Sequence, residues 1–252
     1  MKPTAKDRAI AAAIAVVLFA AWELAARNEW ISSTIFPPPT RILAGFPRLW
    51  REDLLENVSL TLMRFLGGAM LGGIPGIVFG LIVGWSPRMR RIADPFLAAL
   101  HPIPKIVLFP LFIVIFGVSE WSTLAAIALT VFFPTLINAA AGARDISPLY
   151  FEVVRSYGGS RMALFRHVLL PGSLPMILSG VRIAANIGLL VTIAIEFTVT
   201  TRGIGSIIWL AWQTMRIENL YVGVIVCSLI GITINATIQW LLQRVAPWQM
   251  RE

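Results

Sequence analysis

Six long apolar segments, separated by shorter polar ones, constrain this chain more than any other feature of its sequence. The hydrocarbon core of a membrane is about 30 Å thick, and a helix crosses it with about 20 mainly apolar residues. Segments of that length lie at residues 9–26, 60–85, 96–118, 121–143, 169–195 and 220–243. We therefore expect an all-α polytopic membrane protein with about six transmembrane helices, forming a single transmembrane domain over residues 1–252.

The composition excludes the common soluble classes. Apolar residues make up 57% of the 252 residues and charged residues only 13%, about half the ~25% of soluble domains. Disorder, a coiled coil and a disulfide scaffold are excluded by the same figures. The net charge of +8 would suggest nucleic acid in a soluble chain. In a membrane chain it indicates Lys and Arg gathered on the cytoplasmic side, so we expect lipid as the surroundings and no nucleic-acid partner.

The distribution of basic residues predicts the orientation of the spans. With the N-terminus inside, twelve of the 21 Lys and Arg residues, from Lys2 to Arg251, fall on the cytoplasmic side and six fall outside. This bias predicts that both termini are cytoplasmic. Lys6 and Arg8 before the first apolar segment are also typical of a signal peptide. Either interpretation leaves the remaining topology unchanged.

A stripe of five glycines runs along the second segment. Small residues let helix backbones approach closely, and such contact drives helix association in lipid. We expect these glycines to pack against another helix; a role in gating is the alternative. The stripe consists of Gly68, Gly72, Gly76, Gly80 and Gly84.

Polar and irregular features inside the spans are candidates for a transport pathway. Prolines 102, 104 and 110 interrupt any regular helix, and broken backbone is tolerated at membrane depth only beside protein or a water-filled cavity. Arg182 would cost at least ~2.5–3.5 kcal/mol facing lipid. It is therefore either a structural residue inside the bundle or a pore residue that attracts anions, and Lys105 either joins the pathway or extends to the headgroups. The pathway candidates are Pro104, Lys105, Arg182, Asn186, Thr192 and Glu196.

The polar segment at residues 144–168 predicts two short helices on the cytoplasmic side. Ser147 and Pro148 suit the N-cap and first position of one helix, Gly158 stops it, and Ser160 caps the next, which Pro171 is expected to end. Apolar residues at helical spacing form a face that needs a partner, either another cytoplasmic protein or the spans themselves. The face comprises Leu149, Tyr150, Val153, Val154 and Tyr157.

The sequence offers no set of catalytic or metal-binding residues. It contains no Gly-x-x-x-x-Gly-Lys-Ser/Thr loop, so we do not expect ATP hydrolysis by this chain. Its two histidines, His101 and His167, are far apart, and the single Cys227 lies in an apolar run. We therefore expect no metal site. The absence of a strong inverted repeat counts against a self-contained secondary transporter.

Residues 144–171 resemble the signature of binding-protein-dependent ABC importer permeases: Glu-Ala-Ala, three residues, Gly, nine residues, Ile-x-Leu-Pro. Here the elements are Glu152-Val153-Val154, Gly158 and Val168-Leu169-Leu170-Pro171. Further motifs, in order across residues 36–248, are similar to the branch that serves sulfonates, taurine, nitrate, bicarbonate and thiamine precursors. They include Phe36-Pro37-Pro38-Pro39, Gly180-Val181-Arg182 and Arg202-Gly203-Ile204-Gly205.

The resemblance implies a type I ABC importer permease in a bacterial inner membrane. It also implies a second permease copy, identical or paralogous, and a periplasmic binding protein that delivers a small polar or anionic solute. A cytoplasmic dimer of ATPase subunits would bind ATP and Mg, leaving no cofactor on this chain. A stand-alone ion-coupled transporter is the alternative. The contacts implied with the ATPase are Ser147, Leu149, Tyr150, Glu152, Val153, Val154, Tyr157 and Gly158.

Overall fold

The computed structural model describes residues 4–51 and 54–245, and every regular element in these ranges is helical. Lys2 and Arg251, which contribute to the predicted charge distribution, lie outside the described residues. The elements are α1 (Ala5–Arg27), α2 (Pro39–Arg51), α3 (Leu54–Trp85), α4 (Pro87–Leu100), η1 (Lys105–Leu108), α5 (Phe109–Phe116), α6 (Glu120–Arg144), α7 (Pro148–Ser156), α8 (Arg161–Leu164), η2 (Phe165–Leu169), α9 (Leu170–Thr198), α10 (Ile204–Gln213) and α11 (Ile217–Val245).

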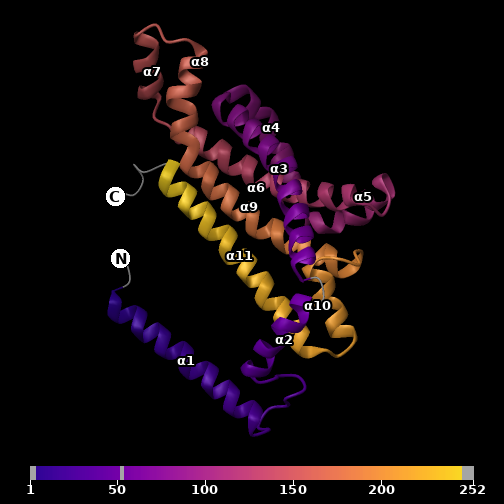
Figure 1. The fold of residues 1–252 in the computed structure, drawn as a ribbon. Coiled ribbons are helices and arrows are strands. Elements are labelled where there is room, and N and C mark those ends of the chain that lie inside the picture. The colour runs from indigo at the N-terminus through magenta and orange to yellow at the C-terminus, as the bar shows by residue number, and fades with distance from the viewer. Residues whose placement is uncertain (1–3, 52–53, 246–252) are drawn as a thin grey trace.

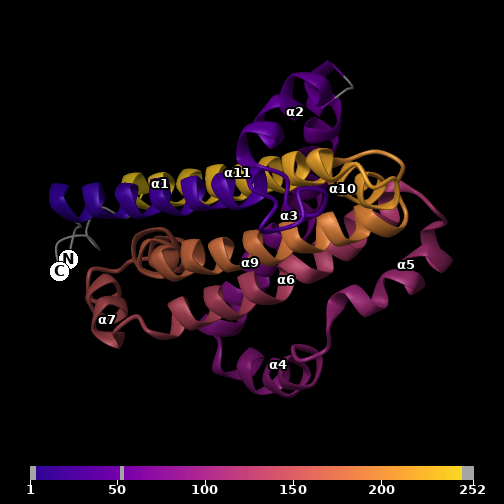
Figure 2. The same ribbon diagram turned by 90° about the horizontal axis from the view of Figure 1, so that it is seen from below.

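Three long helices form the centre of the bundle. Helix α3 packs along α6, α6 packs along α9, and α11 lies against α9 and α10. Ala126 and Ile127 of α6 are fully buried between their neighbours. The amino-terminal end of α1, the carboxyl-terminal end of α11 and the short helix α7 lie at one end of the bundle, whereas α2 and α10 lie towards the other (Figures 1 and 2).

The glycine stripe of α3 lies against α6. A Cβ atom on Gly72 would overlap the carbonyl oxygen of Ala128, and one on Gly76 would overlap the hydroxyl of Thr135. A Cβ atom on each of the other three glycines of the stripe would lie only 2.4–2.5 Å from an atom of α6. Only residues without a side chain allow this backbone approach, so the stripe sets the distance between the two helices.

The predicted third span, residues 96–118, is a bent pair of helices. Helix α4 and the η1–α5 segment meet at 83° across a short break. Pro102 and Pro104 lie in that break and Pro110 lies in the first turn of α5, where its missing amide hydrogen leaves no bond unmade. Within the described ranges, five other helices are long and apolar enough to cross a membrane, and the bent pair makes a sixth if it counts as one span.

The expectation that Pro171 ends a helix before the fifth span is wrong. Residues Arg161–Thr198 form one continuous helical segment that contains a π-helical turn, η2, which ends two residues before Pro171. The amide of Leu170 donates to the carbonyl of Phe165, five residues earlier. Proline lacks an amide hydrogen and crowds the preceding turn, and the wider π-helical turn accommodates it.

Helix α1 is attached to the rest of the chain near one end. Only 6% of the 18-residue apolar stretch of α1 is buried inside the structure, although Ala26 near the end of the helix is buried. The carboxylate of Glu23 accepts hydrogen bonds from the amide (3.0 Å) and hydroxyl (2.7 Å) of Thr40 at the start of α2. The ring of Trp22 also contacts that of Tyr221, with centroids 5.8 Å apart. These contacts fix α1 at the α2 end of the bundle.

Candidate functional site

Helix α7 is defined by signals at both of its ends. Ser147 occupies the N-cap position, without a side-chain capping bond, and Pro148 fills the first position. At the other end Gly158 has a φ of +74°, and its amide donates to the carbonyl of Arg155 while that of Gly159 donates to Val154. This is a Schellman motif, which favours glycine in the left-handed position. Ser160 then caps α8 by accepting from the amide of Ala163, as predicted.

The apolar side chains of α7 lie on two sides of the helix, one facing the bundle and one exposed. Phe151 packs against the cluster that includes Leu169 and Ile177, so one side of the helix rests on the bundle. Leu149 and Tyr150 are each 63% exposed, Val153 is 47% exposed and Tyr157 is 88% exposed. We call these four residues the α7 face. Glu152 is exposed beside them. The α7 face is thus a surface of large apolar side chains with no cover from the described residues of its own chain.

The polar residues of the middle of α9 meet a polar residue of α11. The Arg182 guanidinium donates to the side-chain oxygen of Asn235 at 3.2 Å, and the Asn235 amide nitrogen donates to Asn186 at 2.7 Å. Arg182 and Asn186 are exposed and Asn235 is half-buried. The three side chains form a polar patch, which we call the α9–α11 patch.

Glu196, at the far end of α9, is fully buried in a hydrogen-bonded network. Its carboxylate accepts from the hydroxyl of Thr61 (2.9 Å), the guanidinium of Arg64 (2.9 Å) and the amide of Gly205 (3.0 Å). Arg64 also donates to Glu120 at the start of α6. Burial of a charge requires such pairing. The network therefore ties α3, α6 and α9 to the segment that begins α10.

Thr192 and Lys105, two of the remaining pathway candidates, donate hydrogen bonds to backbone carbonyls of residues close to them in the sequence. Thr192 is fully buried, and its hydroxyl donates to the carbonyl of Gly188 one turn earlier. The Lys105 ammonium donates to three carbonyls at 2.7–2.9 Å, those of Leu100, His101 and Ile103. It also lies 4.5 Å from the centroid of the Phe133 ring. Pro104 is the exposed residue before η1. Lys105 therefore stabilises the bend after α4.

The structure separates the pathway candidates and adds residues that the sequence did not single out. Arg182 and Asn186 share the α9–α11 patch, whereas Glu196 and Thr192 are buried and Lys105 caps the bend. The partners Arg64 and Asn235 come from helices remote in sequence. The sequence offers one signal for both residues, the rarity of polar side chains inside spans. Arg64 lies in the predicted second span and Asn235 in the predicted sixth.

Comparisons with known proteins place this arrangement in a family. The family described as "Binding-protein-dependent transport system inner membrane component" matches residues 76–251. The chain is 28% identical over 252 residues to the taurine transport system permease protein TauC of Escherichia coli (strain K12), covering 98% of this chain and 92% of that protein. It is 34% identical over 231 residues to the putative aliphatic sulfonates transport permease protein SsuC of the same strain, covering 91% and 88%.

The fold is similar to that of an importer of known structure. A chain of the inward-facing MetNI methionine ABC transporter superposes with a TM-score of 0.67 and 17% identity, covering 79% of this chain and 98% of that one. At this identity the similarity shows the fold alone.

The apolar helices and the shared fold define the class: a multi-pass α-helical membrane protein. The chain belongs to the binding-protein-dependent transport system inner membrane component family, and it is the permease subunit of an ABC importer. The predicted family, the all-α fold and the permease function are confirmed.

Proposed function

We propose that the α7 face is the surface on which this permease receives its ATPase subunit. The observation that carries the proposal is the exposure of four large apolar side chains on a helix that stands at the end of the bundle (Figure 1). Exposed apolar patches of this kind are typical of protein interfaces. The Schellman motif and Phe151 hold the helix rigidly, so movement of a bound ATPase would pass directly to α8 and α9.

The same proposal fixes the orientation of the chain. The end that carries α7 is cytoplasmic, and with it both termini, while α2 and α10 face the outside. Lys6, Arg144, Arg161 and Arg244 all belong to helix ends that lie at the α7 end of the bundle. This agrees with the preference of Lys and Arg for cytoplasmic loops. The segment at residues 144–168 is then the coupling segment within one transmembrane domain, residues 1–252.

The solute is a small anion, delivered by a binding protein on the outside. Two relatives are named for taurine and for aliphatic sulfonates, which carry a sulfonate group. The α9–α11 patch places the cation of Arg182 on an exposed face with two amide side chains. We propose that two permease copies, identical or paralogous, bring these faces together around the pathway, and that ATP and Mg bind to the ATPase subunits alone.

Co-purification tests the proposal against a stand-alone ion-coupled transporter. The tagged permease is expressed with its candidate ATPase and binding-protein genes, and the proteins retained on the tag are identified. We expect the ATPase to be retained, and retention to be lost when Ser147–Gly159 is replaced by a short glycine-serine linker. Uptake without any ATPase, driven by an ion gradient in proteoliposomes, would contradict the proposal.

A further inference from the structure

A pocket of about 810 Å³ lies at the α7 end of the bundle, between the corner that joins α3 to α4 and the segment that runs from α7 to η2. Trp85, Ser86 and Pro87 line it from the corner. No residue of the α7 face or of the α9–α11 patch lines it. The residues that line it from the other side are Arg155, Gly159, Arg161, Met162, Leu164 and Phe165.

The pocket carries positive charge that the described part of the chain does not neutralise. Arg155 lies in the last turn of α7 and Arg161 is the first residue of α8. Within the described ranges neither side chain forms an ion pair or a hydrogen bond, and no Asp or Glu is among the lining residues. Glu152, three residues before Arg155 on α7, makes no ion pair with it. Two like charges at one cavity repel each other, so an anion that enters the pocket lowers this repulsion.

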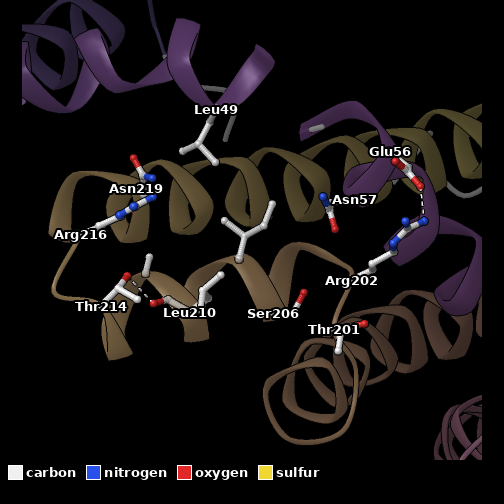
Figure 3. A pocket seen from close by; sticks show the side chains of 12 residues that line it. Leu49, Glu56, Asn57, Thr201, Arg202, Ser206, Leu210, Thr214, Arg216 and Asn219 are labelled. Atoms are coloured by element: carbon white, nitrogen blue, oxygen red, sulfur yellow. Dashed lines mark hydrogen bonds and ion pairs between the residues drawn. The ribbon is translucent and has the colours of Figure 1, made fainter. Parts of the chain in front are cut away.

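A pocket at the opposite end of the molecule shows how a lining arginine is neutralised from within. There the guanidinium of Arg202 pairs with Glu56, which lines the same pocket, and Nη1 and Oε1 are 2.5 Å apart (Figure 3). Arg155 and Arg161 have no such carboxylate at the pocket that they line. Their guanidinium groups therefore remain available to an anion from outside the chain.

Two helices begin at this pocket and add to its positive field. Ser86 is the N-cap of α4, and its hydroxyl accepts a hydrogen bond from the amide of Met89 at 3.3 Å. Arg161 begins the continuous helical segment Arg161–Thr198. The amino-terminal end of a helix carries a partial positive charge, which favours a nearby anion. Both helix ends therefore act in the same direction as the two guanidinium groups.

The apolar wall of the pocket places it at the surface of the membrane. Trp85 is the last residue of α3, a helix long and apolar enough to span the bilayer, and tryptophan is enriched at the depth of the lipid headgroups. The Trp85 indole is partly exposed and donates no hydrogen bond to a described residue. Met162 is exposed and Phe165 is half-buried. Apolar surface beside two cations suits a ligand that has both an anionic headgroup and an apolar tail.

We infer that this pocket binds the headgroup of an anionic phospholipid. The guanidinium groups of Arg155 and Arg161 donate to the phosphate oxygens, and Trp85 and Phe165 contact the glycerol and the upper part of the acyl chains. Basic pockets between helices at the membrane surface are suited to such headgroups. The cations belong to the segment at residues 144–168 and the wall to the end of α3, so the bound lipid joins these two parts of the chain. The inference goes beyond the proposed ATPase contact and does not depend on it.

The test titrates the purified permease in detergent with phosphatidylglycerol, which is anionic, or with phosphatidylcholine, which has no net charge. Native mass spectrometry measures the bound lipid, and thermal unfolding measures the stabilisation. The pocket variant is Arg155→Gln with Arg161→Gln. The matched control is Lys6→Gln with Arg8→Gln, which removes the same charge from exposed positions of α1 at the same end of the bundle. All four side chains are exposed, so both variants should melt like the unaltered permease when no lipid is added.

We expect phosphatidylglycerol to bind the pocket variant about tenfold more weakly than the unaltered permease, because two contacts between charges are lost. The control should bind it normally, and phosphatidylcholine should bind all three proteins weakly. Equal binding of phosphatidylglycerol by the pocket variant and the unaltered permease would overturn the inference, as would an equal loss in the control.

Two further results would give the pocket a different occupant and overturn the lipid assignment. One is saturable stabilisation by inorganic phosphate without lipid, abolished in the pocket variant, which would indicate a site for a free anion. The other is loss of ATPase retention by the pocket variant while phosphatidylglycerol still binds, which would assign Arg155 and Arg161 to the ATPase contact. Failure of the unaltered permease to retain an ATPase would contradict the proposed function and leave the lipid measurement intact.

Discussion

Individual polar residues inside the spans fall into two groups with different chemistry. Arg64 and Glu196 are buried and satisfied by each other and by neighbouring groups. Arg182 is exposed on a helix face, and among the described residues its side chain hydrogen-bonds only to Asn235. A charge of the first kind stabilises the fold, whereas one of the second kind remains available to a ligand. Substitution in the first group is therefore expected to lower stability, whereas substitution in the second is expected to lower uptake.

Glu196→Ala is expected to destabilise the permease. It removes the acceptor of Arg64, Thr61 and the Gly205 amide together, and breaking a buried ion pair costs about 3–5 kcal/mol. Thermal unfolding in detergent measures the effect. The control is Glu56→Ala, which breaks an exposed pair with Arg202 and should cost no more than about 1 kcal/mol. Equal stability of the two variants would contradict a structural role for the network.

Arg182→Ala is expected to lower anion uptake while leaving the fold and ATPase binding intact. Among the described residues the guanidinium donates only to Asn235, at an exposed position, so its loss should cost little stability, whereas the proposed pathway would lose a positive charge. Uptake of a labelled sulfonate into proteoliposomes measures the effect, and Arg182→Lys should retain part of the activity. Normal uptake by the alanine variant would remove Arg182 from the pathway.

At the scale of helices, local signals in the sequence predict much of what the structure contains. The Ser-Pro and Gly-Gly pairs around α7 and the capping role of Ser160 depend only on neighbouring residues. The π-helical turn before Pro171 and the contact of Phe151 with the bundle depend on packing between distant segments. The partners of Arg182 and Glu196 are unpredictable for the same reason, because the sequence does not specify which helices are adjacent.

The glycine stripe of α3 gives a prediction at this scale. Gly72→Ala places a methyl group on the Ala128 carbonyl, and overpacking of this kind costs about 1–3 kcal/mol. Gly231→Ala is the matched control, since a Cβ there would meet only Leu189 at an ordinary 3.6 Å. We expect thermal unfolding of the first variant at a lower temperature and no loss for the second. The same melting temperature for both would show that α3 and α6 are farther apart.

At the scale of the whole molecule, the charge bias and the proposed ATPase contact of α7 predict the same orientation. Enzyme-reporter fusions test it, with alkaline phosphatase active only outside and β-galactosidase only inside. A fusion at Gly159, beside α7, should report the cytoplasm, and one at Trp50 of α2 should report the outside. The reverse pattern would place the α7 face where no ATPase could reach it.

The central claim is that the α7 face joins this permease to an ATPase. Its most direct test is ATPase retention by the double variant Val153→Asp and Tyr157→Asp, compared with Met162→Asp, which alters an exposed apolar residue of the neighbouring α8. All these side chains are exposed, so both proteins should fold. We predict that the double variant loses the ATPase and that the Met162 variant keeps it. Full retention by a folded double variant would contradict the account.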